Sequence, residues 1–304
     1  MKIGSVQFYK RLILTCIALM IIVPTGLCIH FAVKNSELNR EVEALSLIKE
    51  NIYVDEQWFA SAKQTFFLDE NKTEYSLEYQ ELYPDLYVER NEEMFDDVPN
   101  SVYLTFDDGP SPVTKDILKV LKEKDVKATF FVVYNDSSEA AELLREIAEE
   151  GHTIGVHSTT HIYSQIYSSV EAFLSDFEMT ATWIEEVTGN KPEIFRFPGG
   201  SINIYNEGIY QTIIAEMLRR GYLYYDWNVD SGDAARFYSK YSIYNNVVKD
   251  IDKKDKAIVL FHDSLQKKGT LQALPDIIDS LKASGKTILP LTNQVKPITF
   301  SYIN

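Results

Sequence analysis

The chain has 304 residues, 45% hydrophobic and 25% charged, which is typical of a folded globular protein and excludes a disordered one. Its formal net charge of -15 repels phosphate groups and argues against a nucleic-acid partner. The two cysteines, Cys16 and Cys28, both fall in an apolar stretch near the N-terminus, so the sequence predicts neither a disulfide framework nor a cysteine metal site.

That apolar stretch is the first predicted element. Residues 1–11 include three basic residues, and residues 12–33 carry no charge apart from the one that His30 can take. A helix rises about 1.5 Å per residue, so this stretch reaches roughly 33 Å, enough to cross a hydrocarbon core of about 30 Å. The basic flank favours a cytoplasmic N-terminus, so we predict a single-pass anchor with the rest of the chain outside the cell. A cleaved signal peptide is the alternative, but no A-x-A-like cleavage site is present.

Residues 34–97 are predicted to connect this anchor to the main domain. Apolar residues three and four apart over residues 36–52 predict a short stalk helix, and about two heptads are too few to indicate a coiled coil. Residues 53–100 are acidic and rich in Trp, Phe and Tyr, which is too aromatic for a plain disordered linker. We interpret this part as a spacer that packs partly on the main domain, and the sequence assigns it no function.

The main domain, residues 98–304, alternates strand-like and helix-like segments. Strands that alternate with helices indicate a parallel sheet, and about seven such units favour a (β/α) barrel over an open sheet. Amphipathic helices are predicted over residues 114–123, 138–149, 169–187 and 208–219. Strands are predicted over residues 101–106, 128–133, 152–157, 193–197, 222–227, 257–262 and 286–290.

Polar clusters follow five of these strand-like runs. In parallel α/β barrels the active site forms at the carboxyl ends of the strands, so we expect the five clusters to meet at one mouth. They are Asp107-Asp108-Gly109-Pro110, the run from His157 to His161, the run from Arg196 to Gly200, the pair Asp230 and Asp233, and His262-Asp263.

Two of these clusters suggest metal chemistry. His157 and His161 are four residues apart, so on a helical turn both imidazoles would face the same side. Two histidines and a carboxylate form an open zinc site, although such a pair also occurs on ordinary surface helices. The turn after Asp107 and Asp108 lets both carboxylates approach one site, one as a ligand and one as a base, or else exposes two solvated acids.

Taken together and in order, these clusters resemble a known family. The runs TFDDGP, HSTTH, RFPGG, the Asp after Trp227 and LFHD are similar to the five motifs of the polysaccharide deacetylases, the NodB-homology or carbohydrate esterase family 4 group. The resemblance covers about residues 98–295. It implies an α/β fold of the distorted (β/α)7 barrel type and a hydrolase that removes N-acetyl groups from a polysaccharide.

The resemblance also implies roles for individual residues. Asp107 matches the general base, and a water molecule activated by the metal is the nucleophile. His262 matches the general acid. The ligands of a divalent metal, zinc foremost with cobalt, manganese and iron as alternatives, match Asp108, His157 and His161.

Further positions match supporting roles in the family. Arg196 is expected to orient Asp107 by a charged hydrogen bond, and the backbone N–H of Gly199 to hold the oxyanion. Asp233, with Asp230 as its rival, is expected to pair with His262 and raise its pKa. The acetyl methyl pocket is assigned to Trp227 and Leu260, for which plain core packing is the alternative.

Two departures and several alternatives bear on the substrate. Gly199 stands where many members have Tyr, and Ala234 where a Trp often follows the fourth-motif Asp, so the groove is expected to be more open. An outward-facing enzyme points to cell-wall peptidoglycan, with chitin-like polymers and exopolysaccharides as alternative substrates. A silent glycan-binding module, a non-haem iron oxygenase and a hydrolase of small amides are alternatives, but the complete set of base, acid and ligands favours the deacetylase. No protein partner follows from the sequence.

Overall fold

The computed structural model describes residues 77–89, 95 and 98–301. The predicted basic segment, the anchor over residues 12–33 and the stalk helix lie outside these described residues, so they stay predictions. Within the described ranges, no helix combines the length and the apolar character that crossing a membrane requires.

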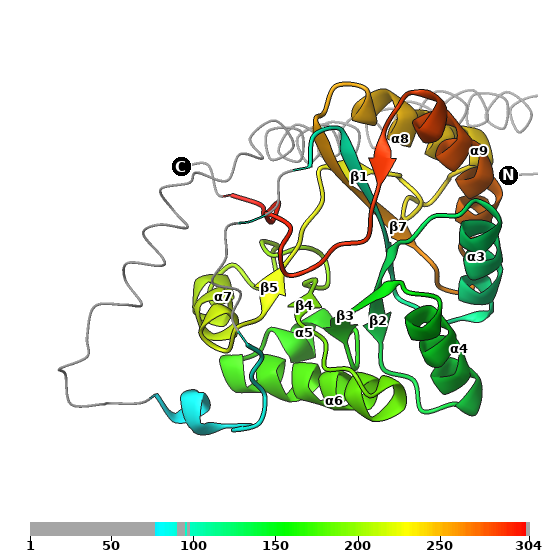
Figure 1. Ribbon diagram of the computed structural model, residues 1–304. Coiled ribbons are helices and arrows are strands. Elements are labelled where there is room, and N and C mark those ends of the chain that lie inside the picture. Colours follow the sequence, from blue (N-terminus) through cyan, green and yellow to red (C-terminus); the bar gives the residue numbers. More distant parts are fainter. Residues whose placement is uncertain (1–76, 90–94, 96–97, 302–304) are drawn as a thin grey trace, which may run out of the picture. The chain divides into compact units, whose positions relative to one another are not determined.

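The described strands form one parallel sheet in the order β5-β4-β3-β2-β1-β7-β6, with β8 also paired to β1 (Figure 1). Every predicted strand is found, whereas β6 was not predicted. The outermost strands β5 and β6 do not pair with each other among the described residues, so the barrel is distorted and open. The strands are β1 (Ser101–Asp107), β2 (Thr129–Val133), β3 (Thr153–Ser158), β4 (Ile194–Phe195), β5 (Leu223–Tyr224), β6 (Val229–Asp230), β7 (Lys256–His262) and β8 (Thr287–Ile288).

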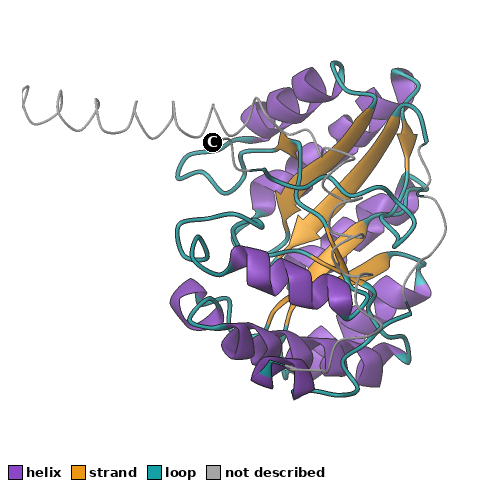
Figure 2. Cartoon of the chain, turned by 90° about the vertical axis from the view of Figure 1, so that its left-hand side faces the viewer, coloured by secondary structure: helices purple, strands orange, loops and turns teal. Residues whose placement is uncertain are grey.

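Helices lie outside the strands and cover them (Figure 2). Serine caps begin several of them: Ser111, Ser137, Ser169 and Ser239 each accept a hydrogen bond from a backbone N–H of the first turn. The four predicted helices are all present. The elements are η1 (Glu78–Glu81), α3 (Pro112–Glu123), α4 (Ser138–Glu149), α5 (Tyr163–Ile166), α6 (Val170–Thr188), α7 (Tyr210–Arg219), α8 (Lys240–Ile251) and α9 (Lys268–Ala283).

Strand β1 is buried on both faces, and its alternation decides which residues reach the interior of the barrel. Val102, Leu104 and Phe106 join the core between the sheet and the helices. Tyr103 belongs instead to a second core inside the barrel. Since Asp107 is four residues after Tyr103, the pleat places its side chain on that interior side. The second core is completed by C-terminal residues, among them Leu291, Val295 and Ile298.

Part of the spacer packs against α7, through a fully buried arginine. Arg220 is 0% exposed, and its Nε donates to Glu216 Oε1 at 2.6 Å. The guanidinium also donates to four backbone carbonyls of the spacer, those of Tyr79, Leu82, Tyr83 and Leu86. These bonds satisfy the buried charge, and they attach residues 79–86 to the helix.

Candidate active site

The predicted polar clusters meet at the carboxyl ends of the strands. Asp107 and His262 are register partners at the ends of β1 and β7, and His157 lies near the end of β3. Arg196 directly follows β4. The parallel sheet therefore brings together residues that are up to 155 positions apart in the chain, as the barrel prediction required.

Asp108, His157 and His161 form a cluster suited to a metal ion. One ligand atom from each lies within 4.8 Å of the others, and Asp108 Oδ1 is 3.3 Å from His161 Nε2 and 3.6 Å from His157 Nε2. Asp108 Oδ1 is buried, with no hydrogen-bond partner in the described part of the chain. A buried carboxylate oxygen facing two imidazole nitrogens is a fitting environment for a divalent cation.

The path of the chain between the two histidines differs from the predicted helical turn. His157 lies in β3, and His161 lies in the loop beyond it with a positive φ of 52°. His157 Nδ1 is 2.8 Å from the carbonyl oxygen of Arg196, which assigns the proton to Nδ1 and leaves Nε2 free to ligate. Burial lowers the pKa of His157 to about 3, so the ring is neutral, as a metal ligand must be.

Asp176 of α6 holds the loop that carries both histidines, and the sequence reading missed it. Its Oδ2 accepts hydrogen bonds from Ser158 Oγ at 2.6 Å and from Thr159 N at 2.9 Å. Its Oδ1 accepts from both the backbone N–H and the hydroxyl of Thr160, each at 2.9 Å. Ser158 Oγ in turn accepts from the backbone N–H of His161 at 2.9 Å. Along the sequence Asp176 resembles the other acidic residues of α6, so only its tertiary contacts reveal the role.

Asp107 is held by a fully buried arginine. Arg196 Nη1 donates to Asp107 Oδ1 at 2.9 Å and to Thr105 Oγ1 at 2.6 Å. Arg196 Nε donates to the carbonyl oxygen of Tyr225 at 2.8 Å, which fixes the plane of the guanidinium. Burial raises the pKa of Asp107, while the charge of Arg196 opposes that rise. The result is a dry, oriented carboxylate beside the metal cluster, with Oδ2 at 3.9 Å from His157 Nε2.

His262 pairs with Asp233, and not with Asp230. Its Nδ1 is 2.7 Å from Asp233 Oδ1, and Asp233 Oδ2 accepts from Thr270 Oγ1 at 2.6 Å. Asp230 is exposed, and its carboxylate accepts from the N–H of Gly232 instead. Burial alone would lower the pKa of His262, but the hydrogen bond and the charge of Asp233 outweigh burial and raise the pKa to about 9. The imidazole is therefore protonated at neutral pH.

The remaining predicted site residues have mixed surroundings. Gly199 has a positive φ of 77° and lies against the ring of Tyr163. Trp227 is half-buried and packs edge-on against Phe300, with ring centroids 4.8 Å apart. Leu260 is buried in β7. The oxyanion role of Gly199 and the acetyl-pocket roles of Trp227 and Leu260 stay predictions.

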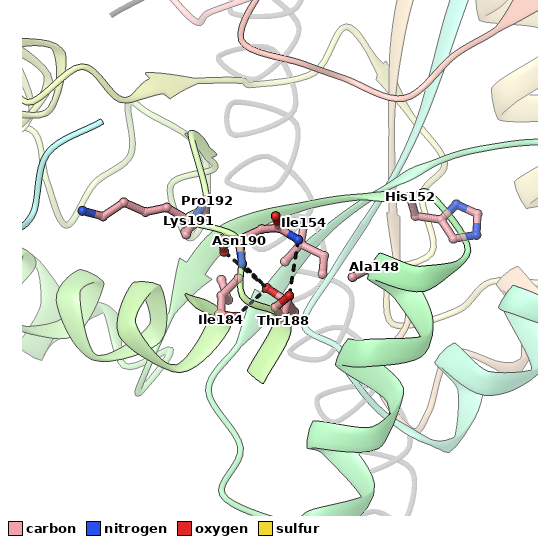
Figure 3. A pocket seen from close by; sticks show the side chains of 8 residues that line it. All are labelled: Ala148, His152, Ile154, Ile184, Thr188, Asn190, Lys191 and Pro192. Atoms are coloured by element: carbon pink, nitrogen blue, oxygen red, sulfur yellow. Dashed lines mark hydrogen bonds between the residues drawn. The ribbon is translucent and has the colours of Figure 1, made fainter. Parts of the chain in front are cut away.

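A separate pocket lies at the opposite, amino-terminal ends of β3 and β4 (Figure 3). It is lined by Ile154, Thr188, Asn190 and residues next to them. His152 at its edge accepts a hydrogen bond on Nδ1 from the backbone N–H of Ala128 at 3.0 Å, which is a structural role. This pocket is therefore distinct from the metal cluster.

A parallel α/β barrel that gathers a three-residue metal cluster, a buried carboxylate and an acid-paired histidine at one mouth defines a metal-dependent hydrolase. Residues 96–214 match the polysaccharide deacetylase family. A peptidoglycan-N-acetylglucosamine deacetylase from Bacillus cereus is 33% identical to the chain, over 62% of this chain and 86% of that protein.

Solved structures agree with this match. The catalytic domain of peptidoglycan N-acetylglucosamine deacetylase from Eubacterium rectale superposes with a TM-score of 0.66 at 38% identity, covering 70% of this chain and 98% of that one. The polysaccharide deacetylase Bc1974 from Bacillus cereus gives a TM-score of 0.58 at 29% identity, covering 66% and 96%. The chain belongs to the polysaccharide deacetylase family, and Asp108, His157 and His161 are placed so that they could hold a metal ion.

Proposed function

We propose that this deacetylase removes N-acetyl groups from peptidoglycan at the outer face of the cell membrane. The observation that carries the chemistry is the arrangement of three units at one mouth: the metal cluster, the Asp107–Arg196 pair and the Asp233–His262 pair. Two of the relatives described above are peptidoglycan N-acetylglucosamine deacetylases, which supports the choice of substrate. The predicted anchor over residues 12–33 supports the location.

Each unit has a role in amide hydrolysis. Asp108, His157 and His161 would hold a divalent cation, whose positive charge would polarise the acetamide carbonyl and acidify water. Asp107 accepts the proton of the attacking water, and Arg196 keeps its carboxylate pointed at that water. His262, protonated through Asp233, gives its proton to the leaving amine. The backbone N–H of Gly199 donates to the developing oxyanion.

The test is acetate release by the full-length chain in detergent, stripped of metal and reloaded with zinc or cobalt. Purified peptidoglycan, N-acetylglucosamine oligomers and a small amide are offered separately. We expect metal-dependent acetate from peptidoglycan, and a loss of about 10²–10⁴-fold in Asp107→Asn with the metal still bound.

Three other results are informative. Acetate from soluble oligomers but none from peptidoglycan would contradict the proposed substrate and leave the deacetylase chemistry intact. Turnover of the small amide alone would favour a same-fold amide hydrolase. Bound metal with no hydrolysis of any substrate would favour a silent glycan-binding module.

A further inference from the structure

Tyr163 occupies the space between the metal cluster and the rim of the site. It opens the short helix α5, two residues after the ligand His161. Its ring meets the ring of His161 edge-on, with centroids 5.4 Å apart, and on the other side meets the ring of Tyr205 at 5.3 Å. The three rings form a continuous series that leads from a metal ligand to an exposed side chain of the loop after β4.

The same ring fills the space in front of Gly199. A Cβ atom at position 199 would lie 3.0 Å from Tyr163 Cε2 and 3.2 Å from its hydroxyl oxygen. Gly199 has no side chain of its own to offer as a wall, so the wall at this point is the tyrosine from a neighbouring loop.

The polar end of Tyr163 is available to a ligand. Its hydroxyl makes no hydrogen bond within the described residues, and the side chain is half-buried. A tyrosine hydroxyl can donate a hydrogen bond, so Tyr163 offers a donor at this point of the rim. A partly buried donor without a partner, placed at a catalytic mouth, is suited to a polar group of the substrate.

Exposed large hydrophobic side chains are concentrated on the loops at the carboxyl ends of the strands. Of the eight exposed large hydrophobic side chains in the described part of the chain, five lie on loops that follow β3, β4, β6 or β7. Tyr205 is one of these five side chains. The five are Ile162, Ile204, Tyr205, Phe237 and Leu265.

We propose that Tyr163 and Tyr205 form the wall against which the sugar ring that carries the scissile acetamide packs, and that the Tyr163 hydroxyl donates to an oxygen of that sugar. A tyrosine offers an apolar face and a polar tip, which matches the C–H face and the hydroxyl edge of a pyranose. This inference rests on the proposed function, since it needs an N-acetylated glycan as the substrate. Tyr163 is then a substrate-positioning residue.

The experiment uses the full-length, zinc-loaded protein and compares Tyr163→Phe, Tyr163→Ala and Tyr205→Ala with the unchanged chain. The substrates are N-acetylglucosamine pentamer and 4-nitrophenyl acetate, a small ester without a sugar, for which only the zinc-dependent part of the rate is compared. Zinc affinity is measured by chelator competition. Tyr244→Phe is the matched control, because it deletes the hydroxyl of another half-buried tyrosine, bonded to Ser280 Oγ at 3.3 Å between α8 and α9.

We expect Tyr163→Phe to lose about 10-fold in kcat/KM on the pentamer, as deletion of one hydrogen bond to substrate does. Tyr163→Ala loses more, and Tyr205→Ala raises KM with little change in kcat. Zinc affinity and the 4-nitrophenyl acetate rate stay unchanged in all three, and Tyr244→Phe behaves as the unchanged chain.

Two results would overturn the inference alone. One is normal deacetylation of the pentamer by the variants. The other is a joint loss of zinc and of both activities, which would mean that Tyr163 only supports His161. A different result would distinguish failure of the proposed function from failure of this inference alone. If the unchanged chain hydrolyses the ester but releases no acetate from any glycan, the function fails first and this inference fails with it.

Discussion

His262 shows how a single neighbour sets the charge of a residue. Its pKa of about 9 lies above the usual 6.5, so the proton stays on through neutral pH and is lost as the pH rises through about 9. If His262 is the acid, kcat/KM must fall on the alkaline side with an apparent pKa near 9. In Asp233→Asn the charge is gone while burial remains, so this alkaline limb moves to lower pH and neutral activity falls about 10²-fold.

The pH profile of kcat/KM, measured with zinc-loaded protein, checks this assignment. Asp230→Asn is the matched control. Asp230 ends strand β6 beside β7, but its carboxylate accepts a hydrogen bond from Gly232 and makes none with His262. An alkaline limb that stays near pH 9 in Asp233→Asn would show that another group provides the proton.

At the scale of an element, helix α6 positions the loop after β3, which carries His161. Asp176→Ala removes four hydrogen bonds to residues 158–160, which hold the chain between the two ligand histidines. We expect zinc affinity to fall about 10–100-fold, as it does when outer partners of metal ligands are removed. Chelator competition measures this, and Glu178→Ala, which loses only a bond to Thr182 on the exposed face of α6, is the control. Equal zinc affinity in the two variants would contradict this role.

Some elements and site residues could be predicted from the sequence, and others could not. The long strands and the motif residues at their ends were predictable, because buried parallel strands leave apolar runs and catalysis leaves polar residues directly after them. Strand β6 was missed because two residues, Val229–Asp230, are too few to show a period. Asp176 and Tyr163 were missed because their roles depend on tertiary contacts, and along the chain they look like ordinary helix residues.

For the whole molecule, Arg220 decides whether part of the spacer stays attached to the catalytic domain. Arg220→Met leaves four spacer carbonyls without their donor and removes the buried one of the two arginines that pair with Glu216. We expect the free energy of unfolding to fall by about 3–5 kcal/mol, measured by denaturant titration. Arg219→Met, whose side chain is 29% exposed while binding the same Glu216, should cost about 1 kcal/mol or less. Similar decreases in the free energy of unfolding in the two variants would refute a special role for the buried Arg220.

The pairing of β1 determines when the sheet can be completed during synthesis of the chain. The first strand of the described sheet lies beside β2, β7 and β8, and it meets Thr287 and Ile288 in register. The interior core likewise needs Leu291, Val295 and Ile298. A ribosome makes these residues after all the other strands of the described sheet, so the sheet cannot be completed until residues 287–298 have been synthesised. Contacts this distant in sequence also slow folding, so the newly made domain passes through a period with β1 only partly paired.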